Sequence, residues 1–499
     1  MITSPASRHA IVLLVCLVAL SAPAHAQAAP KPNILFILTD DQGYGDVARH
    51  GHPLLKTPHQ DALHDQGVRF GKFYVSPSCS PTRAALMTGM HEFRNGVTHT
   101  TLPREHLDLN ATILPQLLKS AGYRTGFIGK WHLGNDGSYA PHKRGFDWCS
   151  TNSGAAKVHF DPIITRNRKR QKRTGYREDI LFDEAMAFID EAKGSPFFCY
   201  LSTYSPHAPV KAPDAFKAPF IGKVDDEEAD YLGMVANLDY NLGRITKHLR
   251  DRGLEQDTIV IWMNDNGQTH GLEVYNAGMR GCKATAWQGG CRAMSFWKWP
   301  GKWQPHTVQN LTAHLDVLPT LCELAGAEIP ADLAAKLEGW SLRPLLESPE
   351  PIAWHDDRLL FHHVGRWPSG LAADHKYAMA AVQTGDYLLV RSEPCGKREC
   401  EKYASQCNTL RMVQAGGKRA TYTKENAAFH WGVTKPGKWS LFDLSTDPKC
   451  ANDLSKSKAD LTTHLSAAYD KWWDGIYPTM IQKGGDKGVP KRSGVKARK

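Results

Sequence analysis

Four acidic and amide side chains in this sequence of 499 residues directly follow two apolar segments. Asp40 and Asp41 come after one segment, and Asp265 and Asn266 come after the other. Carboxylate and amide oxygens are hard ligands that suit Ca²⁺ or Mg²⁺ better than zinc, and crowded carboxylates repel one another without a cation. The pattern therefore predicts a divalent metal site, although aspartates that only cap turns would explain either pair taken alone.

Basic side chains follow two further apolar segments. Lys130 and His132 come after residues 123–128, and His207 comes after residues 196–203. In an open parallel sheet, the residues beyond the carboxyl ends of the strands gather at one edge, where ligands bind. If the four apolar segments are neighbouring strands, these basic residues lie beside the acidic ones.

The sequence around Cys79 contains a specific motif. Taken alone, Cys79 could be a buried thiol or one half of a disulfide, which is the usual state of cysteine in an exported protein. The residues CSPTR at 79–83, followed by TG at 88–89, resemble the signature of the type I sulfatases of the alkaline phosphatase superfamily. In that family the cysteine is converted to a formylglycine aldehyde during export.

The resemblance extends along most of the chain. Positions 82 and 288 carry Thr and Gln where many family members have Ser and Glu. The other segments similar to the family occur in the family's order and are NILFILTDDQGYG (33–45), GKWHLG (129–134), PHAP (206–209), DNG (265–267), MRGCK (279–283), WQGGCR (287–292) and LFDLSTD (441–447).

This resemblance implies one calcium ion per chain. Either Asn264 or Asn266 could supply the amide ligand, although the glycine at 267 favours Asn266. The implied ligands are Asp40, Asp41, the formylglycine formed from Cys79, Asp265 and Asn266.

The resemblance also implies catalytic roles for cationic residues. Lys130 and Lys283 would bind the sulfate group, and Arg83 would hold the hydrated aldehyde. His207, together with Lys283, would face the leaving oxygen. One hydroxyl of the hydrate would attack sulfur, and the second, deprotonated by His132, would expel sulfate and restore the aldehyde.

The elements that must position these residues alternate along the first 350 residues. Continuous apolar runs such as 33–39 predict strands buried on both faces, and amphipathic stretches such as 231–250 predict the helices between them. The alternation predicts an α/β fold with a mostly parallel sheet sandwiched by helices, and the resemblance implies the alkaline-phosphatase-like version of it. Strands at 387–391 and 439–443 and a helix at 461–473 predict a smaller C-terminal α+β subdomain with an antiparallel sheet.

The N-terminus has the pattern of a cleavable secretory signal. Arg8 and His9 precede an apolar run, and small residues at 24 and 26 suit a signal peptidase. The run is too short to span a bilayer, so we expect a secreted or periplasmic protein without a membrane anchor. Its maturation partner would be a formylglycine-generating system. The expected parts are a signal peptide (1–26), a catalytic domain (27–350), a C-terminal subdomain (351–482) and a basic flexible tail (483–499).

The net charge of +10 comes mainly from local basic clusters. Seven Lys and Arg residues lie in the tail, and a second cluster lies between Arg166 and Arg173. These clusters could bind a polyanion, but solvated loops are the simpler interpretation. No motif for nucleic acid is present, so we do not expect a nucleic-acid partner.

Several cysteines remain outside the motif at 79–83. Cys282 and Cys291 could be bridged to each other, because sequence spacing alone does not exclude it. We expect at least one disulfide in the polar stretch near residue 400, where the candidate cysteines are Cys395, Cys400, Cys407 and, further along, Cys450.

Three functions are compatible with these observations. The first is hydrolysis of sulfate esters on carbohydrates or aryl groups. The second is a phosphonate or phosphodiester hydrolase of the same superfamily. The third is a non-catalytic binder of sulfated glycans, which the basic cluster would suit but which would have no need for the intact motif at Cys79. Residues 91–94 and Trp131 are further candidates for lining a substrate pocket.

Overall fold

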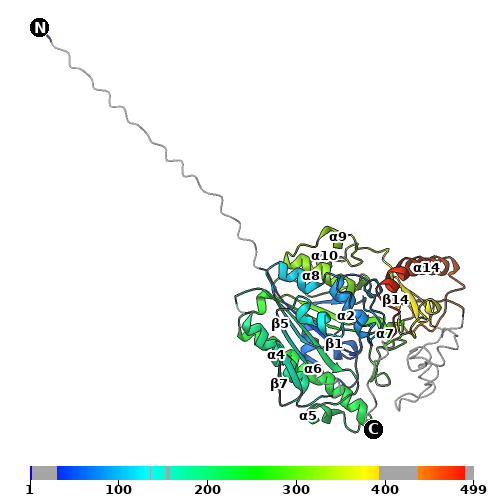
Figure 1. Cartoon of the computed structure of the whole chain (residues 1–499), viewed down its shortest axis with the longest axis horizontal. Helices are drawn as coiled ribbons and strands as arrows, with labels where there is room; N and C mark the ends of the chain where they lie inside the picture. Colours follow the sequence, from blue (N-terminus) through cyan, green and yellow to red (C-terminus); the bar gives the residue numbers. More distant parts are fainter. Residues whose placement is uncertain (3–30, 135, 153–157, 193, 393–436, 489–499) are drawn as a thin grey trace. The chain divides into compact units, whose positions relative to one another are not determined.

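The computed structural model describes residues 1–2, 31–134, 136–152, 158–192, 194–392 and 437–488. Residues Lys31–Lys499 form one compact unit, to which all of the elements below belong (Figure 1). The expected signal peptide and most of the basic tail lie outside the described residues. Within the described parts, no helix is both long and apolar enough to cross a membrane.

The centre of this unit is a ten-stranded sheet. Its five middle strands run parallel, and the strands at both edges add antiparallel pairs. The predicted mostly parallel sheet is therefore confirmed. The strand order is β12 (His306–Val308), β2 (Val68–Phe70), β11 (Ser295–Lys298), β9 (Thr258–Asn264), β1 (Asn33–Asp40), β8 (Phe197–Pro206), β4 (Arg124–Gly129), β5 (Trp148–Asn152), β6 (Ile163–Arg166) and β7 (Lys169–Lys172).

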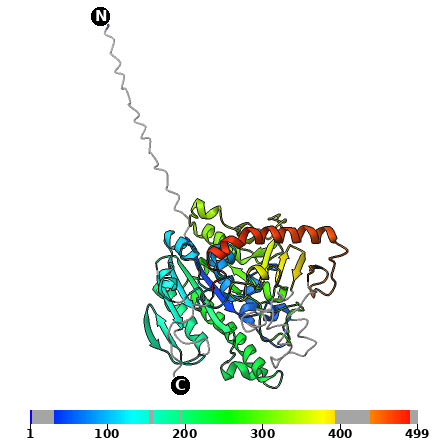
Figure 2. The same ribbon diagram turned by 45° about the vertical axis from the view of Figure 1, so that its right-hand side comes forward.

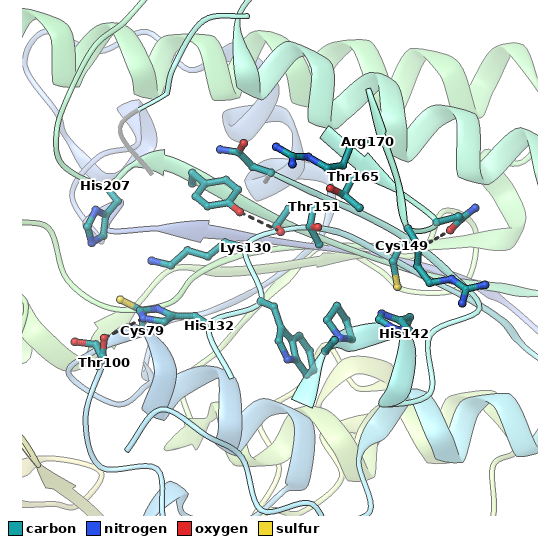
Figure 3. Close-up of a pocket in the computed structure, with 18 of the residues that line it drawn as sticks. Cys79, Thr100, Lys130, His132, His142, Cys149, Thr151, Thr165, Arg170 and His207 are labelled. Atoms are coloured by element: carbon teal, nitrogen blue, oxygen red, sulfur yellow. Dashed lines mark hydrogen bonds between the residues drawn. The ribbon is translucent and has the colours of Figure 1, made fainter. Parts of the chain in front are cut away.

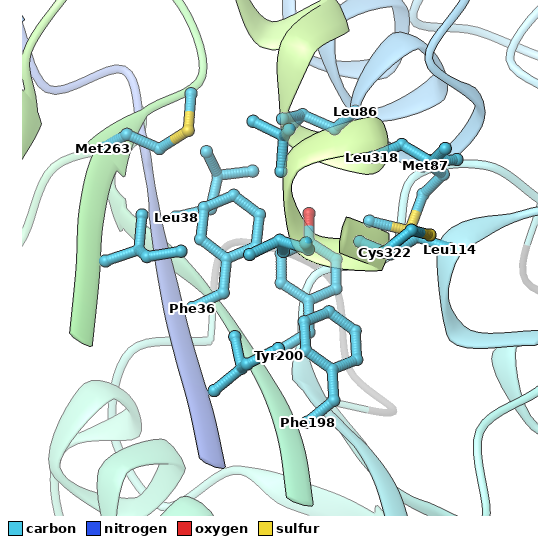
Figure 4. Close-up of a cluster of buried hydrophobic side chains, with 14 of the residues drawn as sticks. Phe36, Leu38, Leu86, Met87, Leu114, Phe198, Tyr200, Met263, Leu318 and Cys322 are labelled. Atoms are coloured by element: carbon cyan, nitrogen blue, oxygen red, sulfur yellow. The ribbon is translucent and has the colours of Figure 1, made fainter. Parts of the chain in front are cut away.

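Helices cover both faces of the sheet because its central strands are apolar on both sides. On β1, Leu35 and Ile37 face a cluster formed with α1 (Pro58–Gln66), α4 (Arg177–Glu191) and α6 (Asp226–Asp251). The alternate β1 residues Phe36 and Leu38 face a second cluster (Figure 4). That cluster contains residues of α2 (Cys79–Thr88), α3 (Leu114–Ser120) and α8 (Val317–Ala325).

A second, four-stranded antiparallel sheet lies towards the C-terminus, as predicted. Its order is β14 (Leu360–His363), β15 (Ala380–Gln383), β16 (Tyr387–Arg391) and β17 (Ser440–Asp443). One face packs against α14 (Ala459–Gln482), which runs alongside these strands in Figure 2. The other face packs against Ala286 and Trp287, which lie between the large sheet's strands β9 and β11 in the sequence. The proposed division of the chain at residue 350 stays a prediction.

The core around α8 generates a test of the fold. Leu318 is fully buried in the cluster of Figure 4, so Leu318→Ala removes buried apolar surface and leaves a cavity. We expect the variant to lose about 2–5 kcal/mol of unfolding free energy in denaturant titrations. Leu109, which is 45% exposed, provides the matched control, and Leu109→Ala should cost no more than about 0.5 kcal/mol. Equal losses in the two variants would contradict this packing.

Candidate active site

Four neighbouring strands end at one edge of the large sheet, and each is followed by residues singled out from the sequence. Asp40 ends β1, Asp265 follows β9, His207 follows β8 and Lys130 follows β4. Ligand atoms of Asp40, Asp41, Cys79 and His207 lie within 4.8 Å of one another. The structure thus brings together segments that are more than two hundred residues apart in the chain.

The acidic residues are held by hydrogen bonds between the ends of β1 and β9. The Asp41 backbone N–H donates to Oδ1 of Asp265 (3.1 Å), and Nδ2 of Asn266 donates to Oδ1 of Asp41 (2.7 Å). Asp41 adopts a left-handed φ of 66°, a conformation that aspartate tolerates better than most residues. Gly267 lets two backbones approach closely, since a Cβ there would lie 1.7 Å from the Gly289 carbonyl oxygen. The DNG segment therefore has a structural reason for its glycine.

The donor set fits a hard divalent cation. Oδ1 of Asp40 and Oδ1 of Asn266 are buried and have no hydrogen-bond partner among the described residues. Burial and the carboxylate of Asp40 raise the pKa of Asp265 well above its usual value, which reflects the cost of crowding these carboxyl groups. Asn264 is already committed, because its Oδ1 accepts from the Met294 N–H (2.8 Å) and its Nδ2 donates to the Asn266 carbonyl (3.0 Å). Of the two amides that the sequence left open, Asn266 has the available oxygen.

Cys79 begins α2 and lies against this acidic group. It is a free cysteine with 1% of its surface exposed, so the alternative that it forms a disulfide is wrong. Burial raises the pKa of its thiol, but Lys130 and Lys283 outweigh burial and hold that pKa well below its usual value. The position is therefore buried, free of a disulfide and close to two lysines.

Arg83 lies one turn after Cys79 on the same helix and is fully buried. Its Nη2 donates to Oδ2 of Asp265 (2.8 Å), and its Nη1 donates to the Lys130 carbonyl (2.7 Å) and to Ser202. The guanidinium thus joins α2 to the ends of β4 and β9 and to the interior of β8. Ser202 is an internal residue of β8, and no sequence motif marks it.

Two lysines face the carboxylates. Nζ of Lys130 donates to Asp40, and Nζ of Lys283 donates to Asp41. Burial works against the charge of Lys283, yet Asp41 and the neighbouring anionic groups raise its pKa above the usual value. Burial likewise opposes the charge of Asp40, but Lys130 and the other nearby cations hold its pKa well below the usual value. The site therefore contains two ion pairs, each between a lysine and an aspartate.

His132 lies beside Cys79 in a left-handed conformation with φ 58° (Figure 3). Its Nε2 is 3.2 Å from the Thr100 carbonyl oxygen and 3.5 Å from Oε2 of Glu105. Burial and Lys130 lower its pKa, but Cys79 and Glu105 outweigh them and raise the pKa above the usual value. Glu105 lies in a loop without a recognisable motif, so sequence reasoning had no signal to find it.

His207 also lies near the carboxylates. Its Nε2 is 3.8 Å from Oδ2 of Asp41, and 31% of its side chain is exposed. Burial and the charge of Lys283 lower the pKa of His207 despite the nearby carboxylates. Figure 3 shows its ring beside Lys130 and Cys79 at one end of a cavity.

This cavity has a volume of about 950 Å³ and extends from Cys79 across β5, β6 and β7 (Figure 3). Trp131 lines it, as anticipated. Residues 91–94 are not among the described residues that line it; Phe93 instead packs against the helix α14. The cavity is thus bounded in part by β5, β6 and β7 and not by residues 91–94.

The bridge between Cys282 and Cys291 is not formed. The Cys282 sulfur donates to the Lys283 carbonyl, and the Cys291 sulfur donates to the Thr285 carbonyl, both at 3.6 Å. Both residues are buried thiols that cap the turns of this loop. Of the candidates for the disulfide expected near residue 400, Cys450 is a free, buried cysteine. Cys395, Cys400 and Cys407 lie outside the described residues.

Comparisons with known proteins identify the family of this chain. The family model described as Sulfatase matches residues 32–327. Human N-acetylgalactosamine-6-sulfatase is 33% identical over 386 residues, which cover 68% of this chain and 70% of that protein. The uncharacterized sulfatase YdeN of Escherichia coli (strain K12) is 31% identical over 402 residues, covering 69% and 71% of the two chains.

Solved structures show the same fold. The crystal structure of Ps i-CgsB in complex with k-i-k-neocarrahexaose matches with a TM-score of 0.72 and 25% identity, covering 92% of this chain and 100% of that one. The family match spans more than half of the chain and contains every residue of the site described above. The chain therefore belongs to the sulfatase family of sulfuric ester hydrolases.

Proposed function

We propose that this protein hydrolyses sulfate esters of carbohydrates or aryl groups with a formylglycine made from Cys79 and a bound Ca²⁺ ion. The observation that carries the proposal is the free, buried Cys79 within 4.8 Å of the carboxylates of Asp40 and Asp41. The proposed calcium ligands are Asp40, Asp41, the modified Cys79, Asp265 and Asn266. Maturation by a formylglycine-generating system and a secreted or periplasmic location belong to the same proposal.

When present, the two groups supply a hydrated aldehyde as nucleophile and a Lewis acid for the sulfuryl oxygens. Two lysines of this chain supply further positive charge to the sulfate group. Lys130 and Lys283 each have an ammonium group that can donate to a sulfuryl oxygen, and fixed donors of this kind stabilise the charge that develops in the transition state. Arg83 holds the turn of α2 that presents position 79.

The hydrogen bonds of His132 suit it to act as a base. If Nε2 carries the ring proton and donates a hydrogen bond to the Thr100 carbonyl, Nδ1 is unprotonated and can accept a proton. Nδ1 of His132 is buried and has no hydrogen-bond partner among the described residues. We propose that it accepts a proton from the hydrated side chain at position 79, and that Glu105 stabilises the resulting imidazolium.

His207 and Lys283 are proposed to face the leaving oxygen of the substrate. Lys283 keeps its proton because the neighbouring carboxylates raise its pKa, so it can donate to an oxygen that gains negative charge. Acid assistance of this kind typically contributes about 10²- to 10⁴-fold. It matters most for alcohol leaving groups such as a sugar hydroxyl, which depart poorly as anions.

The role of Cys79 is tested by Cys79→Ala. The variant should lose about 10⁴-fold or more in kcat for 4-nitrophenyl sulfate, because no other side chain at the site can replace the nucleophile. Cys322→Ala, which removes another buried thiol in α8, should keep the wild-type kcat. Mass spectrometry of the peptide carrying residue 79 should detect the aldehyde in the wild type. Full activity of Cys79→Ala would end the proposal.

The sulfate preference is tested by comparing 4-nitrophenyl sulfate with 4-nitrophenyl phosphate and a phosphodiester on one preparation. We expect the sulfate ester to have the highest kcat/KM, because the matching family model and the most similar relatives are sulfatases. A higher value for either phosphorus ester would favour the phosphohydrolase alternative. Retention of sulfated glycans without any turnover would favour the non-catalytic binder.

The calcium site is tested by thermal unfolding with and without the ion. Added Ca²⁺ should raise the melting temperature of chelator-treated protein, because a ligand at 100 times its Kd stabilises the folded state by about 2.7 kcal/mol. Asp40→Asn should abolish the rise, whereas Asp356→Asn, which alters an exposed aspartate, should preserve it. An equal calcium response in the wild type and Asp40→Asn would place the ion elsewhere.

A further inference from the structure

The hairpin β6–β7 forms part of the cavity wall. Arg166 pairs with Lys169 across the two strands, and the connecting Asn167 and Arg168 both have left-handed φ values of 46° and 70°. These values define a tight two-residue turn of the type that suits the twist of a hairpin. The Asn167 N–H donates to the Cys149 carbonyl (2.8 Å), and the Asn167 Oδ1 accepts from the Cys149 N–H (2.9 Å). The turn is therefore fastened to β5, and Arg168 is carried at a fixed point of the wall.

One face of the hairpin holds it to the protein. Arg166 donates to both carboxylate oxygens of Glu184 in α4, at 2.6 and 2.5 Å, and Arg173 also pairs with Glu184. The Glu184 side chain is fully buried and accepts a further hydrogen bond from Ser150 of β5 (3.0 Å). These two arginines pair with a buried carboxylate, so they are not the solvated loop residues that the sequence suggested.

The opposite face of the hairpin lines the cavity. Thr151 of β5 stands opposite Thr165 of β6, and Thr165 stands opposite Arg170 of β7, so the three side chains form one row across the strands. All three line the cavity and are labelled in Figure 3. Arg168 lines the cavity as well. This row offers two hydroxyl groups and a guanidinium to a bound molecule.

The positive charge of this cavity wall favours the binding of an anion. No acidic residue is among the described residues that line the cavity. Within the described parts of the chain, no carboxylate forms an ion pair with Arg168 or Arg170, in contrast to Arg166 and Arg173. Figure 3 shows Arg170 and Thr165 away from the end of the cavity that holds Cys79 and His207.

We propose that Arg168 and Arg170 form a second anion site, which binds a sulfate or carboxylate group of the substrate other than the sulfate that is hydrolysed. The inference rests on the proposed function and narrows its substrate to a glycan with at least two anionic groups. The volume of about 950 Å³ lies at the upper end of the range for small-molecule sites, so more than one sugar can enter. Thr151 and Thr165 would donate to, or accept from, the sugar between the two anions.

The experiment compares matched disaccharides with Arg170→Gln. One disaccharide carries a single sulfate on the reacting sugar; the second adds a sulfate, and the third a carboxylate, on the neighbouring sugar. Charge-assisted hydrogen bonds predict that the wild-type preference for a doubly anionic disaccharide falls about 10- to 100-fold in kcat/KM in Arg170→Gln. Arg168→Gln should act in the same direction.

Lys169→Gln is the matched control, because Lys169 is exposed in the same hairpin and its strand position places it on the other face. It removes the same charge and should leave the preference unchanged. An equal loss in Lys169→Gln and Arg170→Gln would overturn the proposal, since general attraction by the hairpin would then explain the effect. An unchanged preference in Arg170→Gln would overturn it as well.

Binding separates this inference from the proposed reaction. Calorimetry with Cys79→Ala protein needs no turnover, and replacing Arg170 in that background should weaken the doubly anionic disaccharides about 10- to 100-fold. If the wild type hydrolyses no sulfate ester but this loss of binding is seen, the proposed function fails and the anion site stands. The disaccharide that loses more identifies sulfate or carboxylate as the natural group.

Discussion

The buried guanidinium of Arg83 is the contact on which the geometry of the active site depends. A buried cation loses its hydration, so it needs hydrogen bonds and an opposite charge from the protein. Removing one partner of a buried ion pair typically costs about 3–5 kcal/mol of stability. Arg83 obtains its partners from three neighbouring strands at once, through Asp265 after β9, the Lys130 carbonyl after β4 and Ser202 within β8. Because Cys79 lies one turn away on the same helix, these contacts also set the position of the proposed nucleophile.

The second constraint is the crowding of carboxyl groups at the edge of the sheet. Asp40 and Asp41 remain ionised because Lys130 and Lys283 lie against them, whereas burial and Asp40 raise the pKa of Asp265. The lysines compensate only part of the acidic group, and the Oδ1 atoms of Asp40 and Asn266 have no hydrogen-bond partner among the described residues. A proposed calcium ion would balance the carboxylates and leave the lysines available to an anionic substrate.

Much of this arrangement was predictable from the sequence. The apolar run that became β1 has no polar face, which identified a central strand, and the rule for strand ends then placed Asp40 and Lys130 together. Glu105 and Ser202 were not found, because each acts through a contact that only tertiary packing creates. The basic cluster between Arg166 and Arg173 predicts a solvated loop, because a segment rich in Arg and Lys has no apolar pattern typical of a strand. The structure instead has the hairpin β6–β7 there. The helix α14 continues past the predicted end at residue 473, with Pro478 inside it.

The packing of the small sheet against Trp287 links the two parts of the chain. Trp287 is fully buried, its ring contacts Phe442 of β17 at 5.5 Å between centroids, and it lies four residues after Lys283. The segment that matches the family ends at residue 327, before any strand of that sheet begins. A defect in the small sheet would therefore loosen the loop that carries Lys283, one of the proposed sulfate-binding residues, without changing any residue of the family match.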